Sequence, residues 1–157
     1  MTEVTLRPLE DADLDAIFEQ MRDPEAVRMA AVTAEDPSDR AVFDAHMRRV
    51  RAAPDTTNRA VLVDGVLAGT IASFVMEGDT EVTYWIDRAY WGQGIATRAL
   101  TELLQLVPVR PLMARVAADN EASRRVLEKC GFRSIGEAES YAPARKSVIT
   151  ELILTHP

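Results

Sequence analysis

The chain has 157 residues, of which 47% are hydrophobic, and a formal net charge of −7. This length suits one domain with one core, and the composition is that of a soluble globular protein rather than a disordered one. The negative charge argues against a nucleic-acid-binding surface and against binding to an anionic membrane. We therefore expect one globular domain over residues 1–157.

Cysteine and histidine content narrows the class further. One cysteine excludes a disulfide framework within the chain and fits a reducing compartment. The first eight residues lack the apolar core of a signal peptide, and no apolar run is long enough to span a bilayer. Two isolated histidines and one cysteine supply no metal-ligand cluster. The sequence thus predicts a cytoplasmic protein without a metal site.

The first third of the chain predicts one short strand and two helices. Residues 4–6 form the strand, and Asp11 caps a helix with apolar side chains at helical spacing up to Met21. Pro24 interrupts that pattern, so residues 22–39 are expected to form a mobile, turn-rich loop that can include one helical turn. A second helix follows from residue 39 and ends near Pro54.

The middle and the end of the chain alternate between strand and helix signals. Asp64-Gly65 between apolar runs is a strong hairpin signal, and a second turn at residues 77–79 leads into a strand over 81–87. These segments predict an antiparallel meander. After it come a helix over 92–107, a strand over 112–117, a helix over 121–130, and strands over 132–137 and 147–154.

A glycine turn after the meander is the most informative local feature. Gly92 and Gly94 lie between the strand that ends near Ile86 and the helix that follows them. A strand that turns through glycines into a helix presents unpaired backbone N–H groups at the positive end of the helix dipole. Such a turn binds phosphate groups.

A second motif makes this reading specific. It runs from Asn120 through Ser123, Leu127 and Cys130 to Gly131-Phe132. Together with Trp91-Gly92-Gln93-Gly94-Ile95-Ala96, it resembles the GNAT superfamily of acetyl-CoA-dependent N-acetyltransferases, with the ribosomal-protein alanine N-acetyltransferases as the nearest branch. The resemblance is specific over residues 79–135 and looser elsewhere. It implies an α+β fold with a mixed, mostly antiparallel central sheet flanked by about four helices.

The resemblance also implies a binding site for acetyl-CoA as co-substrate. Backbone amides of the glycine turn would hold the pyrophosphate, and Asn120 and Ser123 would contact the pantetheine arm. The turn residues are Trp91, Gly92, Gln93, Gly94, Ile95, Ala96 and Thr97. In one respect the chain departs from the family. Ala89, with Arg88 beside it, stands where Gln or Arg is usual, so no side-chain contact is expected from that position.

Catalytic roles fall on the strand before the turn. Alternation puts Glu81 on one strand face with Thr83 and Trp85, and Tyr84 and Ile86 on the other. By resemblance, Glu81 is the candidate general base, and backbone N–H groups of Tyr84, Trp85 and Ile86 would bind the acetyl oxygen. The tyrosine with which many family members protonate the thiolate is replaced here by Leu127, so the general acid is unassigned.

Two other functional readings remain open from the sequence. One is a sensor or interaction module of the same fold that binds acyl-CoA without turnover, which the missing tyrosine and Ala89 favour. The other is a nucleotide-binding α/β protein, disfavoured because neither Gly-x-Gly-x-x-Gly nor a P-loop lysine is present. We expect direct acetyl transfer to a primary amine, either a protein N-terminus or a small amine, with the acceptor near residues 22–39 and 74–76. The oligomeric state, monomer or homodimer, is open.

Overall fold

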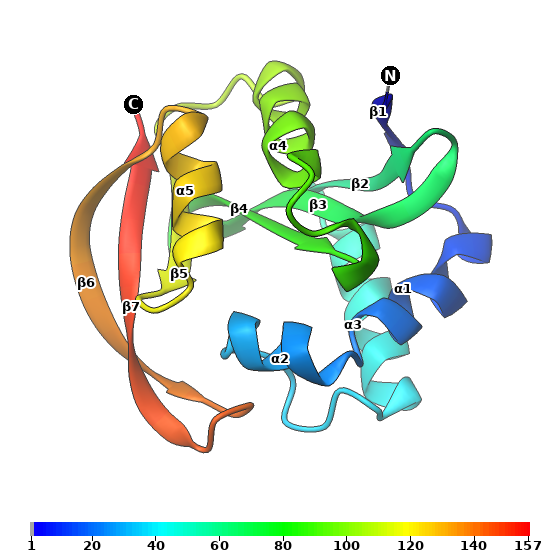
Figure 1. Ribbon diagram of the computed structural model, residues 1–157, viewed down its shortest axis with the longest axis horizontal. Coiled ribbons are helices and arrows are strands. Elements are labelled where there is room, and N and C mark those ends of the chain that lie inside the picture. Colours follow the sequence, from blue (N-terminus) through cyan, green and yellow to red (C-terminus); the bar gives the residue numbers. More distant parts are fainter. Residues whose placement is uncertain (1) are drawn as a thin grey trace.

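The structure, a computed structural model, describes residues 2–157, and its framework is one mixed β-sheet (Figure 1). Within these residues seven strands pair in the order β1-β2-β3-β4-β5-β7-β6. All neighbours are antiparallel except β4 and β5, which are parallel. This confirms the expected mixed, mostly antiparallel sheet. The strands are β1 (Val4–Pro8), β2 (Thr57–Val63), β3 (Val66–Met76), β4 (Asp79–Ile86), β5 (Leu112–Ala117), β6 (Arg133–Ala142) and β7 (Ser147–His156).

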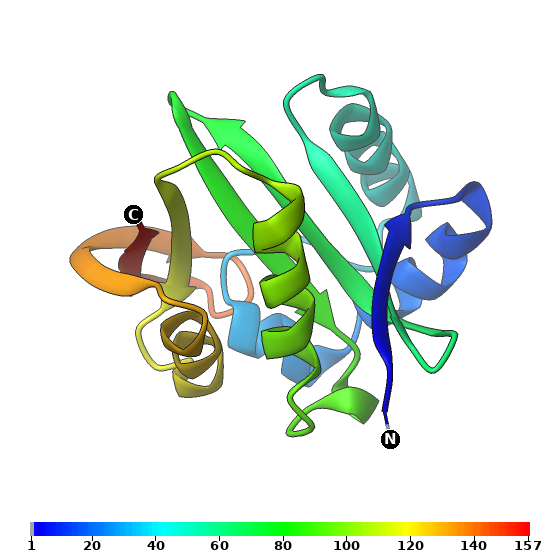
Figure 2. The ribbon, with the colours of Figure 1, turned by 90° about the horizontal axis from the view of Figure 1, so that it is seen from above.

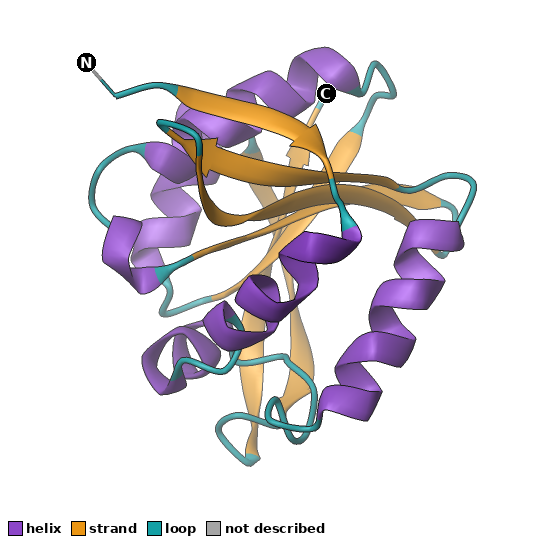
Figure 3. Ribbon diagram, turned by 90° about the vertical axis from the view of Figure 1, so that its right-hand side faces the viewer, coloured by secondary structure: helices purple, strands orange, loops and turns teal. Residues whose placement is uncertain are grey.

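Helices cover both faces of the sheet (Figures 2 and 3). Helices α4 (Ile95–Leu106) and α5 (Glu121–Lys129) pack on one face, and α1 (Leu14–Gln20), α2 (Pro24–Ala30) and α3 (Arg40–Ala52) lie on the other. Two short 3-10 turns, η1 (Asp11–Asp13) and η2 (Arg88–Tyr90), connect elements. No helix within residues 2–157 is long and apolar enough to cross a membrane.

Helix α2 is the main departure from the sequence-based expectation. Residues 22–39 were expected to form a loop because Pro24 breaks the apolar periodicity, yet Pro24 is the first residue of a helix. Proline is tolerated there because the first helical N–H has no partner in any case. Asp23 caps this helix, since its Oδ2 accepts a hydrogen bond from the Ala26 N–H at 3.1 Å. The expected loop with one helical turn therefore contains a longer helix, of seven residues over Pro24–Ala30.

Two other boundaries also differ. Helix α4 begins at Ile95 rather than at Gly92, because Gly92 and Gly94 adopt left-handed φ angles of 74° and 76°. Strand β6 extends to Ala142, well beyond the expected end at residue 137, because it pairs with β7 along its whole length.

The apolar core divides according to the two faces of the sheet. The larger cluster lies under α4 and α5 and includes Val82 and Ile86 of β4. A smaller cluster joins Phe18 of α1 to Phe43 of α3. On β4, the side chain of Trp85 points away from the larger cluster and donates a hydrogen bond to the Gln20 carbonyl at 3.1 Å. The strand alternation expected from the sequence is thus present in β4.

Gly69 of β3 provides a test of how closely the central strands must pack. A Cβ atom at Gly69 would lie 2.1 Å from the Trp85 carbonyl oxygen, a backbone atom that cannot move without moving β4. We expect Gly69→Ala to lower the free energy of unfolding by about 3 kcal/mol, as overpacking in cores does. Gly136 is a matched control, because both glycines lie at register shifts, Gly69 between β2 and β3 and Gly136 between β6 and β7. An added Cβ at Gly136 would meet nothing within 4 Å. Denaturant titration of both variants checks this, and equal stabilities would contradict it.

Candidate active site

The site forms where two neighbouring parallel strands separate. Strands β4 and β5 pair only through Thr80 with Leu112 and Glu81 with Met113. Beyond these pairs the strands diverge, although β4 stays paired with β3 as far as Ile86. A cavity of about 1030 Å³ lies at this opening, and its lining comes from both strands and from helices on both faces of the sheet.

The opening leaves backbone N–H groups of β4 without a strand partner. The Asp87 N–H donates to the Ala68 carbonyl of β3 at 2.8 Å. Because N–H groups alternate in direction along an antiparallel strand, the Trp85 N–H also points to β3, and those of Tyr84 and Ile86 point to the open side. The Ile86 carbonyl, on that same side, accepts a hydrogen bond from Trp91 Nε1 at 2.8 Å. Tyr84 and Ile86 therefore present N–H groups to the cavity.

The glycine turn forms the neighbouring wall. Gly94 is the N-cap residue of α4, and its carbonyl accepts the first helical hydrogen bond, from the Arg98 N–H at 3.1 Å. The next N–H groups of the helix have no intrahelical partner, as at any helix start. Of the seven residues expected to cradle phosphate, six line the cavity: Trp91, Gly92, Gly94, Ile95, Ala96 and Thr97. The Gln93 side chain instead donates to the Ala89 carbonyl at 3.2 Å.

The start of α5 contributes the opposite wall. Asn120 caps the helix, since its Oδ1 accepts from the Ser123 N–H at 3.2 Å, and its Nδ2 donates to the Met29 carbonyl of α2 at 3.3 Å. Asn120 and Ser123 both line the cavity. Asn120 is thus the N-cap that the helix signal at residues 121–130 calls for, and its side-chain amide also links α5 to α2.

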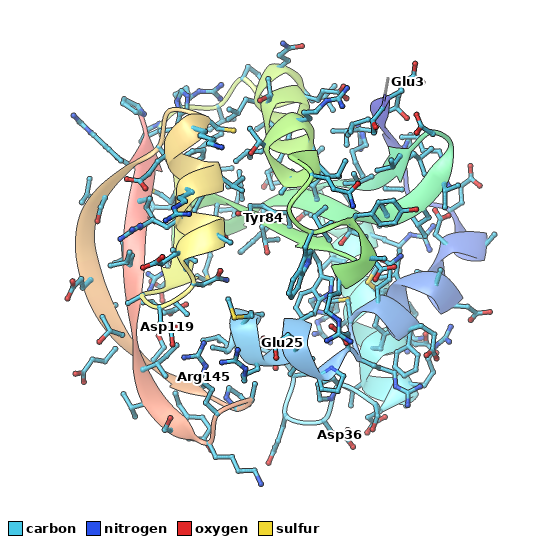
Figure 4. The ribbon with its side chains drawn as sticks, viewed as in Figure 1. Glu3, Glu25, Asp36, Tyr84, Asp119 and Arg145 are labelled. Carbon is cyan, nitrogen blue, oxygen red and sulfur yellow. The ribbon has the colours of Figure 1, made fainter. Side chains whose placement is uncertain are left out.

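Tyr84 brings a hydroxyl group to the same wall (Figure 4). Its hydroxyl lies 2.6 Å from the Oγ of Ser123. Burial raises the pKa of Tyr84 to about 12, so the phenol stays protonated at neutral pH. Leu127, which replaces the usual tyrosine, is 2% exposed and packs in the larger apolar cluster. Near α5, the hydroxyl groups of Tyr84 and Ser123 thus form a hydrogen-bonded pair at the cavity wall, and Leu127 supplies none.

Glu81 is the last residue of β4 that pairs with β5, and it is 6% exposed. Its Oε1 is 3.8 Å from Nε of Arg115 in β5. Burial raises the pKa of the Glu81 carboxyl, and the Arg115 guanidinium partly offsets this, while the charges of Asp79, Glu151 and Glu77 raise it further. Arg115 is among the residues that line the cavity and Glu81 is not. The cavity therefore borders the guanidinium of this pair and not the carboxylate.

Arg115 and helix α2 were missed by the sequence-based reading. The role of Arg115 depends on the register between β4 and β5, which no local pattern encodes. Of the two segments expected near the acceptor, the first borders the cavity through residues 26, 29, 30, 32–34, 36, 37 and 39, but residues 74–76 do not line it. Residues 74–76 pair with Glu81, Thr80 and Asp79 of β4, away from the opening.

Comparisons with known proteins agree with this geometry. The family model described as "Acetyltransferase (GNAT) domain" matches residues 3–133. The chain is 29% identical over 149 residues to the Bacillus subtilis protein named "Putative phosphinothricin acetyltransferase YwnH", covering 85% of this chain and 86% of that protein. It is 29% identical over 147 residues to "Putative ribosomal N-acetyltransferase YdaF" of the same organism, covering 86% and 80%.

Solved structures match the fold over nearly the whole chain. The Sinorhizobium meliloti phosphinothricin acetyltransferase in complex with AcCoA superposes with a TM-score of 0.82 at 19% identity, covering 98% of this chain and 88% of that one. Mycobacterium smegmatis RimJ in complex with CoA-disulfide has a TM-score of 0.79 at 24% identity, covering 97% and 80%. With the family model spanning residues 3–133, the opened strands and glycine turn are those of a GNAT acetyltransferase, and the chain belongs to that family.

Proposed function

We propose that the protein transfers an acetyl group from acetyl-CoA to a primary amine by direct transfer in a ternary complex. The observation that carries this proposal is the divergence of β4 and β5 beyond Glu81. It places unpaired N–H groups of β4 and the N-terminus of α4 around one cavity. We also propose that residues 1–157 act as one acetyltransferase domain, because the described strands belong to one sheet.

The part of the cavity between the starts of α4 and α5 fits CoA. The positive φ angles of Gly92 and Gly94 leave open space where a side chain would stand, since an added Cβ would meet no atom within 4 Å. Backbone N–H groups between Trp91 and Thr97 would bind the pyrophosphate. Gln93 would contribute through its backbone, because its side chain is held by the Ala89 carbonyl. Asn120 and Ser123 would contact the pantetheine arm from the α5 side.

Amide formation from a thioester needs a neutral amine, a polarised carbonyl and a leaving thiolate. Acetyl-CoA supplies an acetyl thioester whose thiolate leaves as the amide forms. The amine must be neutral to attack, and a lysine-like amine has a pKa of about 10.4 against about 7.7–8.0 for an α-amine. The N–H groups of Tyr84 and Ile86 stabilise the negative charge that develops on the carbonyl oxygen. Of the three backbone N–H groups expected to bind the acetyl oxygen, that of Trp85 points to β3, so we retain those of Tyr84 and Ile86.

Glu81 is the proposed general base. Its carboxylate, held beside Arg115, would take the proton that the amine gives up, with a short water chain bridging it to the cavity. Burial raises its pKa toward the range in which a carboxylate accepts a proton readily. Its place at the last β4–β5 pair puts it within the strand that also carries the N–H groups.

The decisive experiment is thiol release from acetyl-CoA with a panel of amines, run beside a measurement of acetyl-CoA affinity. The panel contains peptides with varied N-termini, amino acids, polyamines and aminoglycosides. Turnover with any class supports the enzyme. Binding of acetyl-CoA without turnover across the panel would instead favour the acyl-CoA sensor, and absence of binding would contradict both.

Gly94→Ala tests the phosphate-binding turn. A left-handed φ costs an alanine about 1 kcal/mol of stability, and the displaced N–H groups should weaken acetyl-CoA binding about tenfold, the worth of one charge-assisted hydrogen bond. Gly65→Ala is the matched control, because Gly65 has a φ of 83° with the same open space but lies in the β2–β3 turn. Calorimetric titration with acetyl-CoA should separate the two variants. Equal affinities would contradict the proposed cradle.

A pH profile tests Glu81 and Arg115 together. A base must be ionised, so kcat/KM should fall as pH drops through the raised pKa of Glu81. Arg115→Gln removes the group that lowers this pKa, so the acidic limb should move to higher pH with the same acceptor. Glu81→Gln should lower kcat about 100-fold and abolish that limb. An unchanged acidic limb in Arg115→Gln would show that Glu81 is not the titrating base.

A further inference from the structure

The cavity has a second half, on the face of the sheet that carries α1, α2 and α3. We call it the acceptor half, and it lies across the β4–β5 opening from the glycine turn. It is lined by residues of α2, of the segment 31–39, of α3, of β4 and of β5. The apolar ones include Met29, Val32, Val42, Phe43 and Trp85.

Two of these apolar side chains are open to solvent. Val32 is 46% exposed and Val42 is 50% exposed. They come from different segments, the loop after α2 and the first turn of α3, and both border the same cavity. Burying them would gain about 25 cal/mol for each Å² removed from water. An acceptor with an apolar group would therefore be held at this mouth by surface that the protein leaves uncovered.

The two aspartates that line the acceptor half each have a local structural role. The Oδ1 of Asp36 accepts from Ser38 N and Ser38 Oγ, at 3.0 Å and 2.6 Å. The Oδ1 of Asp39 caps α3 by accepting from the Val42 N–H at 3.2 Å. One oxygen of each carboxylate is thus engaged within the chain, and both residues are exposed.

Two guanidinium groups balance these carboxylates. Arg49 and Arg115 line the same half, so the two aspartates and two arginines that border it cancel in formal charge, although the whole chain carries −7. Glu81, which pairs with Arg115, is not among the lining residues. A polyamine or aminoglycoside would bring several positive charges next to Arg49 and Arg115 and would find no excess of negative charge among the lining residues. Like charges repel each other more strongly where they are shielded from water.

We propose that the acceptor is a monoamine that carries an apolar group on or next to the carbon bearing the amine. This proposal rests on the acetyl-transfer function proposed above. Two sources share this chemistry, a polypeptide N-terminus whose first residue is apolar and a free apolar amine. Polyamines and aminoglycosides are expected to be weaker acceptors, because they bring extra positive charge and less apolar surface.

Affinity measurements with a graded acceptor series test the proposal. The probes are alaninamide, valinamide and leucinamide, peptides of one sequence that begin with Ala or Leu, spermidine and an aminoglycoside. Each is titrated into CoA-saturated protein, and each is assayed for kcat/KM with acetyl-CoA. Both quantities should improve about two- to fourfold per added methylene, and spermidine should bind more weakly than leucinamide.

Variants link the effect to the mouth of the cavity. Val42→Ser should reduce the preference for Leu over Ala several-fold. Val66→Ser is the matched control, because Val66 is 57% exposed at the start of β3 and does not line the cavity. It should keep the wild-type preference.

The outcomes separate this proposal from the function on which it rests. A flat series, a preference for spermidine, or an identical effect of Val42→Ser and Val66→Ser on the preference would overturn it. Graded binding of the amines without turnover would keep it while contradicting the acetyl-transfer function. A peptide that outperforms the matching amino amide tenfold assigns the acceptor to a polypeptide N-terminus, and equal performance assigns it to a small amine.

Discussion

The short pairing between β4 and β5 is the constraint on which the site depends. Two parallel pairs, ending at Glu81 with Met113, hold the halves of the sheet together. If the ladder continued, β5 would satisfy the N–H groups of Tyr84 and Ile86 and would fill the cavity. Because it stops, a strand in the middle of the sheet keeps an unpaired edge, which elsewhere in proteins invites pairing with another chain. Here the edge lies between α4 and α5 on one face and α2 on the other, so it is reachable through the cavity rather than from outside.

Separated strands need other contacts to keep their positions, and α2 provides them. Asn120 Nδ2 donates to the Met29 carbonyl, and Arg145 Nε, in the turn between β6 and β7, donates to the Arg28 carbonyl at 3.1 Å. Arg145 also forms a bidentate pair with Asp119, just before α5 (Figure 4). These contacts join three segments that are distant in sequence around the opening. The start of α5, which carries Asn120 and Ser123 to the cavity wall, is thereby tied to α2 on the other face of the sheet.

The sequence predicted the parts of this arrangement that local patterns encode. Glycines at 92 and 94 and the Asn120 cap act through their own backbone and their immediate neighbours, so they could be found without a structure. The alternation along β4 was likewise readable, because a period of two fixes the face of each side chain. Arg115 could not be found in this way, since it matters only through the β4–β5 register. Helix α2 was missed for a different reason: Pro24 ends a helix in one context and begins one in another, and Asp23 as its cap decides which.

The position of Glu81 links the stability of the sheet to the chemistry of the site. A carboxylate that is 6% exposed loses most of its hydration, and burying a charge without a partner is costly. Arg115, at 3.8 Å, supplies the positive charge, but its guanidinium also borders the cavity and is not removed from solvent. The pair is therefore only partly compensated, which keeps the pKa of Glu81 raised. A closer, fully buried pair would stabilise the ionised form so well that the carboxylate would be a poor proton acceptor. The strand opening thus leaves N–H groups of β4 without a strand partner and leaves the neighbouring carboxylate imperfectly paired, and the proposed mechanism depends on both features.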